Sequence, residues 1–250
     1  MFAVLVPDLF DVLSFLPYQS LLDVPVLQSP NFANYVAGKN QQVVDVLIAA
    51  LAKLAEHQAV DVSSILLWCE TVGHTHLLHA LHERAQEQKI RSVYLSLQQV
   101  TQPQLVCADL DQAYQLILLD DLEACLGDQA AEQALLHLFH GVRRQNKLLL
   151  WTAHASMQQC NFALTDLKTR IQSGLVWQLQ PLDDQEQKQF IRTYIARYGL
   201  ATQAAVADYL WTRLSRDLHD QVIILDDLIK KTLQHKQKIT IRNVKKFLAL

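Results

Sequence analysis

The spacing of hydrophobic residues changes along this chain of 250 residues. Up to about residue 182, short apolar runs alternate with segments in which apolar residues recur every three to four positions. The runs of strand length are 65–68, 91–97, 115–119, 147–152 and 175–179, and the helical segments are about 40–57, 75–88 and 129–144. Strands that alternate with helices predict a parallel sheet covered on both faces, with ligands at the carboxyl ends of the strands. The expected fold class is therefore α/β.

No convincing strand follows residue 182. The helical stretches there, at about 183–198, 202–214, 218–236 and 240–249, predict a small bundle appended to the sheet domain. Charge changes at the same point, because residues 1–182 carry 10 Lys and Arg against 17 Asp and Glu, whereas residues 183–250 carry 12 against 8. We expect a boundary near Pro181, with an N-terminal extension at 1–26, a sheet domain at 27–181 and a helical domain at 182–250.

The basic excess of the helical domain is concentrated near its end. It could contact phosphates or an acidic partner, or it could be a solvated helix face. The residues concerned are Lys230, Lys231, Lys236, Lys238, Arg242, Lys245 and Lys246.

Composition narrows the class of protein. Half of the residues are hydrophobic, which is typical of a globular chain with a substantial core. The four cysteines occur singly, without a Cys-x-x-Cys pair, so neither a zinc ribbon nor a disulfide framework is predicted and a reducing cytoplasm fits best. The apolar stretch at 1–18 lacks a basic start and contains two prolines and two aspartates. We interpret it as a peripheral extension rather than a signal peptide, and we expect no membrane span.

Residues 64–79 (SILLWCETVGHTHLLH) have the order of a phosphate-binding P-loop, since a buried strand leads through Gly73 into a helix beginning near Thr75. In such loops glycines let backbone N–H groups surround the phosphates, a lysine reaches the β and γ phosphates, and a hydroxyl holds magnesium. Here Trp68 stands at the first glycine and His74 at the lysine. A strand, a glycine turn and a helix also recur in other α/β proteins, so this motif alone is weak.

The run LILLDDLE at 116–123 is a second candidate motif. An apolar strand ending in Asp120 and Asp121 has the pattern of a Walker B strand, in which one carboxylate orients magnesium-bound water and the next polarises the attacking water. The alternative is a buried strand that simply ends in two solvated aspartates.

Together these segments resemble the DnaA-type bacterial initiators of the AAA+ class, and most of all the initiator-inactivator family called Hda. The resemblance covers about 27–250. It is carried by 31–44, 72–81, 116–128, 163–187 (ALTDLKTRIQSGLVWQLQPLDDQEQ), 214–228 and the closing TIRNVKKFLAL. It implies an AAA+ P-loop parallel-sheet domain with a small C-terminal helical lid. No initiator-type helix-turn-helix domain follows, so no sequence-specific DNA binding is expected.

The resemblance also implies a nucleotide site, which this chain has altered. His74 replaces the P-loop lysine, His154 the sensor aspartate and His219 the second-sensor arginine, and neutral imidazoles give a triphosphate little positive charge. We therefore expect no hydrolysis of its own ATP and no requirement for magnesium. Two alternatives stay open, which are ADP as a structural ligand and a site filled by Trp68 and His74. The residues that the resemblance places around a nucleotide are Val36, Gly73, His74, Thr75, His76, Asp120, Asp121 and His219.

Arg170 keeps the family pattern, at the position of an arginine finger. Such a finger acts on the nucleotide of a neighbouring subunit, so the resemblance implies that this chain promotes hydrolysis of ATP bound to a DnaA-type initiator and switches replication initiation off. The alternative is a simple pair with Asp166, one helical turn earlier.

The inactivator family also carries an N-terminal peptide, Q-L-x-L-P-L, that binds the DNA polymerase III sliding clamp. The candidate here is 21–26, in which Leu21 replaces the glutamine while Leu22, Val24, Pro25 and Val26 keep the apolar pattern. An apolar tail that packs on its own domain is the alternative. Homo-oligomer formation stays open.

Other classes of function were weighed against this one. The histidines at 74, 76, 79 and 82 could share one helix face and bind zinc or nickel, but no His-Glu-x-x-His is present and the resemblance explains two of them as helix surface, so we expect no metal site. A hydrolysing AAA+ motor would need the missing lysine. A nucleotide-binding adaptor or interaction scaffold at the replication machinery is the main alternative.

Overall fold

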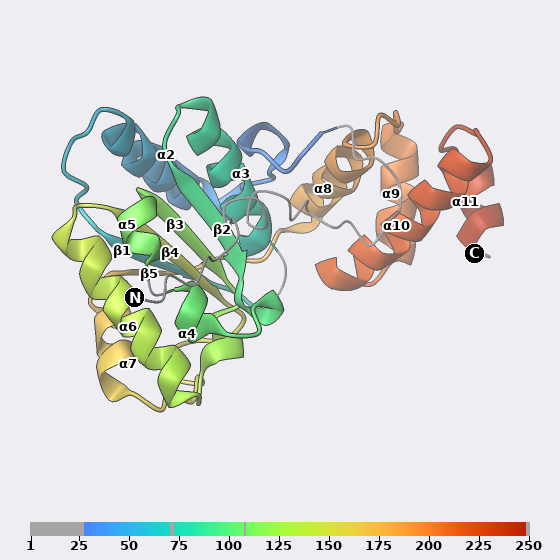
Figure 1. Cartoon of the computed structure of the whole chain (residues 1–250). Helices are drawn as coiled ribbons and strands as arrows, with labels where there is room; N and C mark the ends of the chain where they lie inside the picture. The colour runs from blue at the N-terminus through green and yellow to red at the C-terminus, as the bar shows by residue number, and fades with distance from the viewer. Residues whose placement is uncertain (1–27, 71–72, 108, 249–250) are drawn as a thin grey trace, which may run out of the picture.

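The structure is a computed structural model that describes residues 28–70, 73–107 and 109–248. It consists of a sheet domain and a helical domain that lie side by side (Figure 1). The predicted N-terminal extension, with the clamp-peptide residues Leu22, Val24, Pro25 and Val26, lies outside the described residues. Among the described helices, none has the length and apolar character needed to cross a membrane.

The sheet has five parallel strands in the order β2-β3-β4-β1-β5. Because the strands are parallel, the carboxyl ends of the adjacent strands β3, β4 and β1 meet at one edge, with Leu119 opposite Trp151 and Trp68 opposite Ala153. The strands are β1 Ser64–Trp68, β2 Ser92–Ser96, β3 Leu116–Asp120, β4 Leu148–Ala153 and β5 Leu175–Gln178.

Alternate residues of each strand face opposite sides of the sheet. In β4, Leu148 and Leu150 pack under α2 (Gln41–Ala55) and α3 (His74–Glu87), whereas Leu149 and Trp151 pack on the other side. That side is covered by α4 Pro103–Val106, α5 Leu110–Ala113, α6 Gln129–Arg144 and α7 Thr165–Gln172. Short 3-10 turns connect the elements, at η1 Phe32–Asn34, η2 Gly38–Asn40, η3 Leu97–Gln99 and η4 Leu122–Cys125.

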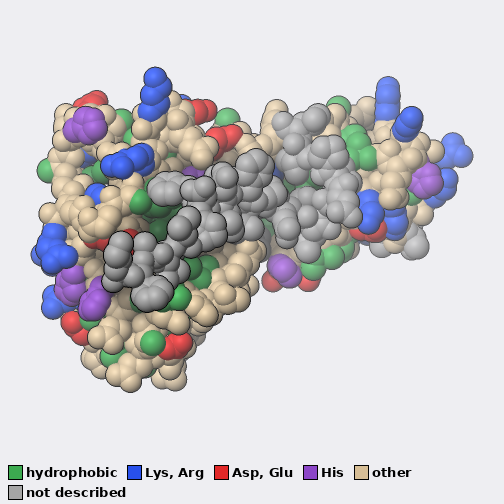
Figure 2. Space-filling model, viewed as in Figure 1, with side chains coloured by type: hydrophobic (Ala, Val, Ile, Leu, Met, Phe, Trp, Pro, Cys, Tyr) green, Lys and Arg blue, Asp and Glu red, His purple; other side chains and the backbone are tan. Residues whose placement is uncertain are grey.

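The helical domain has its own hydrophobic core. Its helices are α8 Asp184–Ala196, α9 Ala204–Arg213, α10 Leu218–Gln234 and α11 Ile241–Leu248. Asp183 and Asp217 cap α8 and α10, since each carboxylate accepts two backbone N–H groups of the first turn. Lys and Arg side chains gather at the far end of this domain (Figure 2). The exposed ones are Lys230, Lys236, Lys238, Arg242, Lys245 and Lys246.

The predicted α/β class, the parallel sheet and the C-terminal helical lid are confirmed. Each predicted strand and helix is present, with ends that differ by at most two residues. Sequence periodicity did not predict α4, α5 or α7, and the first two have only four residues, which is too short to show a period.

Candidate functional site

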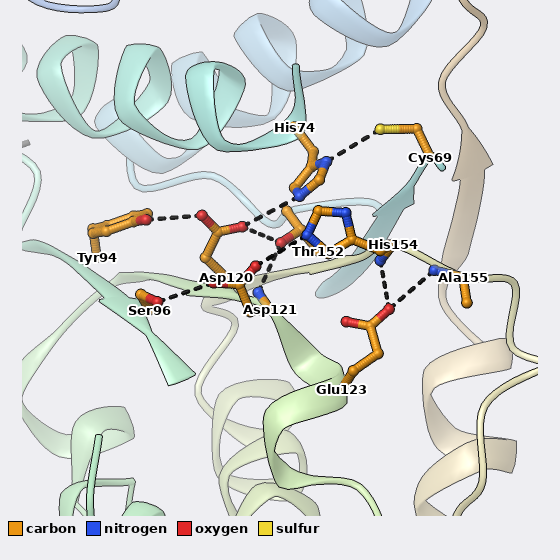
Figure 3. A network of polar contacts seen from close by, with 10 residues as sticks. All are labelled: Cys69, His74, Tyr94, Ser96, Asp120, Asp121, Glu123, Thr152, His154 and Ala155. Atoms are coloured by element: carbon orange, nitrogen blue, oxygen red, sulfur yellow. Dashed lines mark hydrogen bonds and ion pairs between the residues drawn. The ribbon is translucent and has the colours of Figure 1, made fainter. Parts of the chain in front are cut away.

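A network of polar side chains lies where β3, β4 and the first turn of α3 meet (Figure 3). Asp120 is the last residue of β3 and is buried. Its carboxylate accepts hydrogen bonds from the hydroxyls of Tyr94, at 2.8 Å, and Thr152. Both carboxylate oxygens therefore have protein donors, and the aspartate is held rigidly at the end of the strand.

Asp121 turns away from the strand direction. Its backbone is in the left-handed region, with φ 62°, which aspartate tolerates better than most residues. The backbone N–H donates to Thr152 Oγ1 at 3.1 Å, and the carboxylate accepts from Ser96 Oγ at 3.0 Å. The other carboxylate oxygen lies 3.3 Å from His154 Nε2. The alternative of two solvated aspartates is thus wrong, because Asp120 is buried and Asp121 is engaged by β2 and β4.

His74 opens α3 and is almost completely buried. Its Nδ1 lies 3.1 Å from Cys69 Sγ, and its Nε2 lies 3.9 Å from Asp120 Oδ1. Burial lowers the pKa of His74 below its ordinary 6.5, and this effect outweighs the opposite influence of Asp120. At neutral pH the ring is therefore uncharged and cannot replace the cationic lysine of a P-loop.

His154 follows β4 and faces His74 edge to face, with ring centroids 4.6 Å apart. The loop that carries it is fixed by Glu123, whose carboxylate accepts the backbone N–H groups of His154 and, at 3.0 Å, Ala155. The His154 side chain is half exposed, so the network opens to solvent on this side.

A cavity of about 270 Å³ adjoins the network, between the sheet domain and the helices α8 and α10. Most of the predicted nucleotide residues line it, which are Val36, Gly73, His74, Thr75 and His76. Asp120 and Asp121 lie behind His74 rather than in the lining. Trp68 is also outside the lining and packs against the core below the sheet.

The sheet domain and the helical domain each match a protein-family model. The family model of the bacterial DnaA ATPase domain matches residues 27–178, and the model of the Hda lid domain matches residues 184–248. The chain belongs to the bacterial DnaA ATPase family. Its helical domain is similar to the lid domain of Hda.

Solved structures share the fold of this DnaA-family chain at low sequence identity. Domain III of the Thermotoga maritima replication initiation protein DnaA is 18% identical with a TM-score of 0.72, over 90% of this chain and 98% of that one. AMPPCP-bound DnaA from Aquifex aeolicus is 21% identical with a TM-score of 0.64, over 85% and 70%. The Thermotoga maritima RuvB Holliday junction branch migration motor is 15% identical with a TM-score of 0.65, over 90% and 73%. These likenesses concern the fold.

Arg197 is a site residue that the sequence analysis missed. It ends α8 in the DnaA-family lid, is 2% exposed and lines the cavity. Its Nε donates to the carbonyl of Gln28 at 3.3 Å, and its guanidinium lies 5.6 Å from the Tyr194 ring centroid. The sequence signal was the arginine that closes an amphipathic helix facing the sheet domain, but only the packing shows that its side chain is buried beside the cavity.

His219 takes a different position from the one expected. It lies in the first turn of α10, is exposed and does not line the cavity. The residues of α10 that line the cavity are Leu218 and Val222. Its backbone N–H donates to the capping Asp217 at 2.7 Å. The lid thus brings one buried arginine and apolar side chains to the cavity.

The cavity has groups that suit an adenine nucleotide without magnesium. The first turn of α3 presents backbone N–H groups to the cavity, Arg197 supplies a positive charge, and the segment around Val36 forms an apolar wall. Burial raises the pKa of the Tyr35 phenol, which keeps it neutral here. Both oxygens of Asp120 already accept hydrogen bonds, which is a poor arrangement for holding a hydrated magnesium ion.

The histidines along α3 do not form one site. His76 donates from Nε2 to the carbonyl of Asn31 at 3.2 Å, and His79 stacks against Tyr94 with centroids 4.2 Å apart. His82 contacts Ser92 Oγ at 2.9 Å. They point to different neighbours, so the alternative of a one-face metal site made by His74, His76, His79 and His82 is not formed in the part of the chain that the structure describes.

Low pH should destabilise the fold, because His76 and His79 are buried in it. Burial lowers the pKa of His76 and of His79 to about 4, whereas each titrates near 6.5 when unfolded. The unfolded chain takes up these protons first, so stability is complete above pH 6.5 and falls as pH drops toward 4, by up to about 1.4 kcal/mol per pH unit for each histidine. Urea unfolding midpoints at pH 7, 6 and 5 measure this. His79→Phe keeps the ring contact and should reduce the slope, and an unchanged slope would contradict the assignment.

Arg170 lies on α7, away from the chain's own cavity. Its Nε is 3.2 Å from Asp166 Oδ1, and 39% of its side chain is exposed. Arg170 therefore forms the ion pair with Asp166 that was the alternative to a finger. An exposed ion pair of this kind stabilises the fold by under about 1 kcal/mol, and it leaves the guanidinium accessible to a partner.

Proposed function

We propose that this chain is a negative regulator of chromosomal replication initiation, which acts with the DNA sliding clamp to stimulate hydrolysis of ATP bound to a DnaA-type initiator. Arg170 is the arginine finger in this proposal. The observation that carries it is a contrast within one molecule: the chain's own site holds a buried neutral His74, while Arg170 is retained and accessible.

The position of Arg170 suits a group that acts on another subunit. Helix α7 is anchored by its buried side chains Leu167 and Ile171, so the flank of the helix that carries Arg170 is held in a fixed orientation. A guanidinium delivered by a rigid element loses little freedom when it meets a phosphate. The cavity of this chain is not within reach of α7, because no residue of α7 lines it.

The first test is a turnover assay with a cognate initiator preloaded with ATP. Conversion of the bound ATP to ADP is followed with DNA-loaded clamp, with this chain, and with both. Stimulation that needs both proteins supports the proposal. If the chain binds the initiator or the clamp without raising the rate, the trans-acting role is wrong and the chain is an adaptor.

The adaptor is the second candidate function, and the cavity favours it. Space lined by Arg197, Val36 and the first turn of α3 is retained although the P-loop lysine is lost. In this form the chain would bind ADP as a structural ligand and serve as an interaction scaffold at the replication machinery. Homo-oligomer formation and cytoplasmic location remain expectations for both candidates.

The isolated chain should not turn over ATP. A neutral, buried His74 supplies no positive charge to a γ phosphate, and Asp120 is engaged by two hydroxyls. Steady-state phosphate release from the purified chain should equal the rate without protein, at ATP concentrations up to the millimolar range. ADP binding measured by calorimetry on the same sample separates the two functions: binding without turnover is the adaptor's signature, and turnover would contradict the expectation for both candidates.

A further inference from the structure

Three side chains with metal-binding atoms converge beside the end of β3 (Figure 3). The ligand atoms of His74, Asp121 and His154 all lie within 4.8 Å of one another. They come from the first turn of α3, the residue after β3 and the residue after β4. Among the described residues, no other group of three His, Cys, Asp or Glu side chains is arranged in this way.

The Nε2 atom of His74 makes no hydrogen bond, although the residue is only 1% exposed. A buried polar atom without a partner costs free energy, and native structures contain few of them. The ring points toward the Asp120 carboxylate and the His154 ring rather than into the apolar core (Figure 3). An atom bound at this point would satisfy the nitrogen.

The distances suit one small cation. His154 Nε2 lies 3.3 Å from Asp121 Oδ1. Two ligands of a tetrahedral zinc ion are separated by roughly 3.3 Å, given Zn–N and Zn–O bonds of about 2.0–2.2 Å. His74 must approach by a small side-chain rotation, and the half-exposed His154 gives an ion access from solvent.

Neighbouring groups orient the ligands. Cys69 Sγ lies 3.1 Å from His74 Nδ1 and can accept a hydrogen bond from Nδ1–H when Nε2 is bound, which selects the required tautomer. Ser96 Oγ donates to the second oxygen of Asp121 at 3.0 Å. Asp120 adds a negative charge 3.9 Å from His74 Nε2. Ligands that are held by such partners keep the geometry that a metal site needs.

We propose that His74, Asp121 and His154 form a binding site for a divalent transition-metal ion, zinc above all, with water as the fourth ligand. Two imidazoles and one carboxylate suit zinc, whereas magnesium and calcium prefer oxygen ligands alone. The ion would join α3, β3 and β4, and this does not depend on the function proposed above.

The test is a zinc titration of the untagged full-length chain by calorimetry, because a polyhistidine tag would bind zinc itself. The wild type should bind one equivalent. His154→Ala removes an exposed ligand, and Asp121→Asn removes the charge while tolerating the left-handed backbone. Each should weaken zinc binding by about 100-fold or more, since even outer partners of metal ligands are worth about 10- to 100-fold. His137→Ala, an exposed histidine on α6, should bind as the wild type does.

Two further readouts separate a built site from scattered histidine binding. Cobalt should give the visible absorption of a four-coordinate ion in the wild type and in His137→Ala, but not in His154→Ala. Zinc should raise the melting temperature of the same two proteins only. Circular dichroism without metal checks that each variant is folded. The proposal is overturned if the wild type binds no stoichiometric zinc, or if His154→Ala and Asp121→Asn bind it as tightly as His137→Ala does.

Discussion

Arg170→Ala should abolish the stimulation of ATP hydrolysis in the initiator, with a loss of about 10³-fold or more in the stimulated rate. An arginine finger stabilises charge that develops on the transferred phosphoryl group, and such fingers are worth about 10³–10⁵ in rate. The measurement is single-turnover conversion of initiator-bound ATP to ADP with DNA-loaded clamp. Binding of the variant to the initiator is measured in parallel, so that lost affinity is not mistaken for lost chemistry.

Two companion variants make this prediction specific. Asp166→Asn breaks the ion pair that holds Arg170 at 3.2 Å but leaves the guanidinium in place, so stimulation should persist. Arg170→Lys keeps the charge but lacks the planar fork, and it should lose most of the stimulation. If Asp166→Asn were as inactive as Arg170→Ala, the arginine would have only a structural role within α7.

Glu132→Ala should have the largest effect on stability. Glu132 is fully buried on α6, and its carboxylate accepts the backbone N–H groups of Gly127, at 2.8 Å, Ala163, at 2.8 Å, and Leu164, at 2.7 Å. Each donor left without a partner costs about 1–3 kcal/mol, so the free energy of unfolding should fall by about 3 kcal/mol or more. Urea unfolding at pH 7 measures it.

Matched substitutions on α6 test the cause. Gln133→Ala, at the exposed neighbouring position, should change the free energy of unfolding by no more than about 0.5 kcal/mol. Glu132→Gln keeps the shape but turns an amide NH₂ toward a backbone N–H, and it should be intermediate. Equal stabilities for Glu132→Ala and Gln133→Ala would contradict the anchoring role.

The Glu132 contacts also connect stability to the proposed function. Leu164 is the N-cap of α7, and its backbone N–H is accepted by the carboxylate of another helix, as an N3 carboxylate does in a capping box. Helix α7 carries Arg170. Glu132→Gln, if folded, should therefore reduce stimulation without touching the arginine.

Local sequence patterns predicted much of the architecture. Helix α6 was predicted with its observed bounds, 129–144, because its apolar stripe is regular and Asp128 caps it. The end of β3 at Asp120 was predicted to within one residue, since a continuous apolar run followed by two aspartates is typical of a buried parallel strand. Among the site residues, Val36, Gly73, His74, Thr75 and His76 do line one cavity, while His219 does not.

Local sequence patterns could not predict the side-chain contacts. The sequence predicts His74 at the lysine position of a P-loop, but only the fold buries the side chain beside Asp120 and places its ring centroid 4.6 Å from that of His154. Arg197 and Glu132 carried no motif, and each makes contacts with residues more than 30 positions away. The sequence predicts no metal site, and the histidines weighed as the alternative share one helix, whereas the converging His74, Asp121 and His154 come from three elements.

The sequence determined some features and the tertiary structure others, because the interactions involved act over different separations along the chain. Hydrophobic periodicity, helix caps and strand-ending carboxylates act over a few residues, so the chain's own order determined the parallel sheet and the helical lid. Burial, hydrogen-bond satisfaction and the pKa of His74 depend on which distant segments pack together. The tertiary structure alone therefore decided that His74 is a neutral buried imidazole, facing a second histidine and a carboxylate.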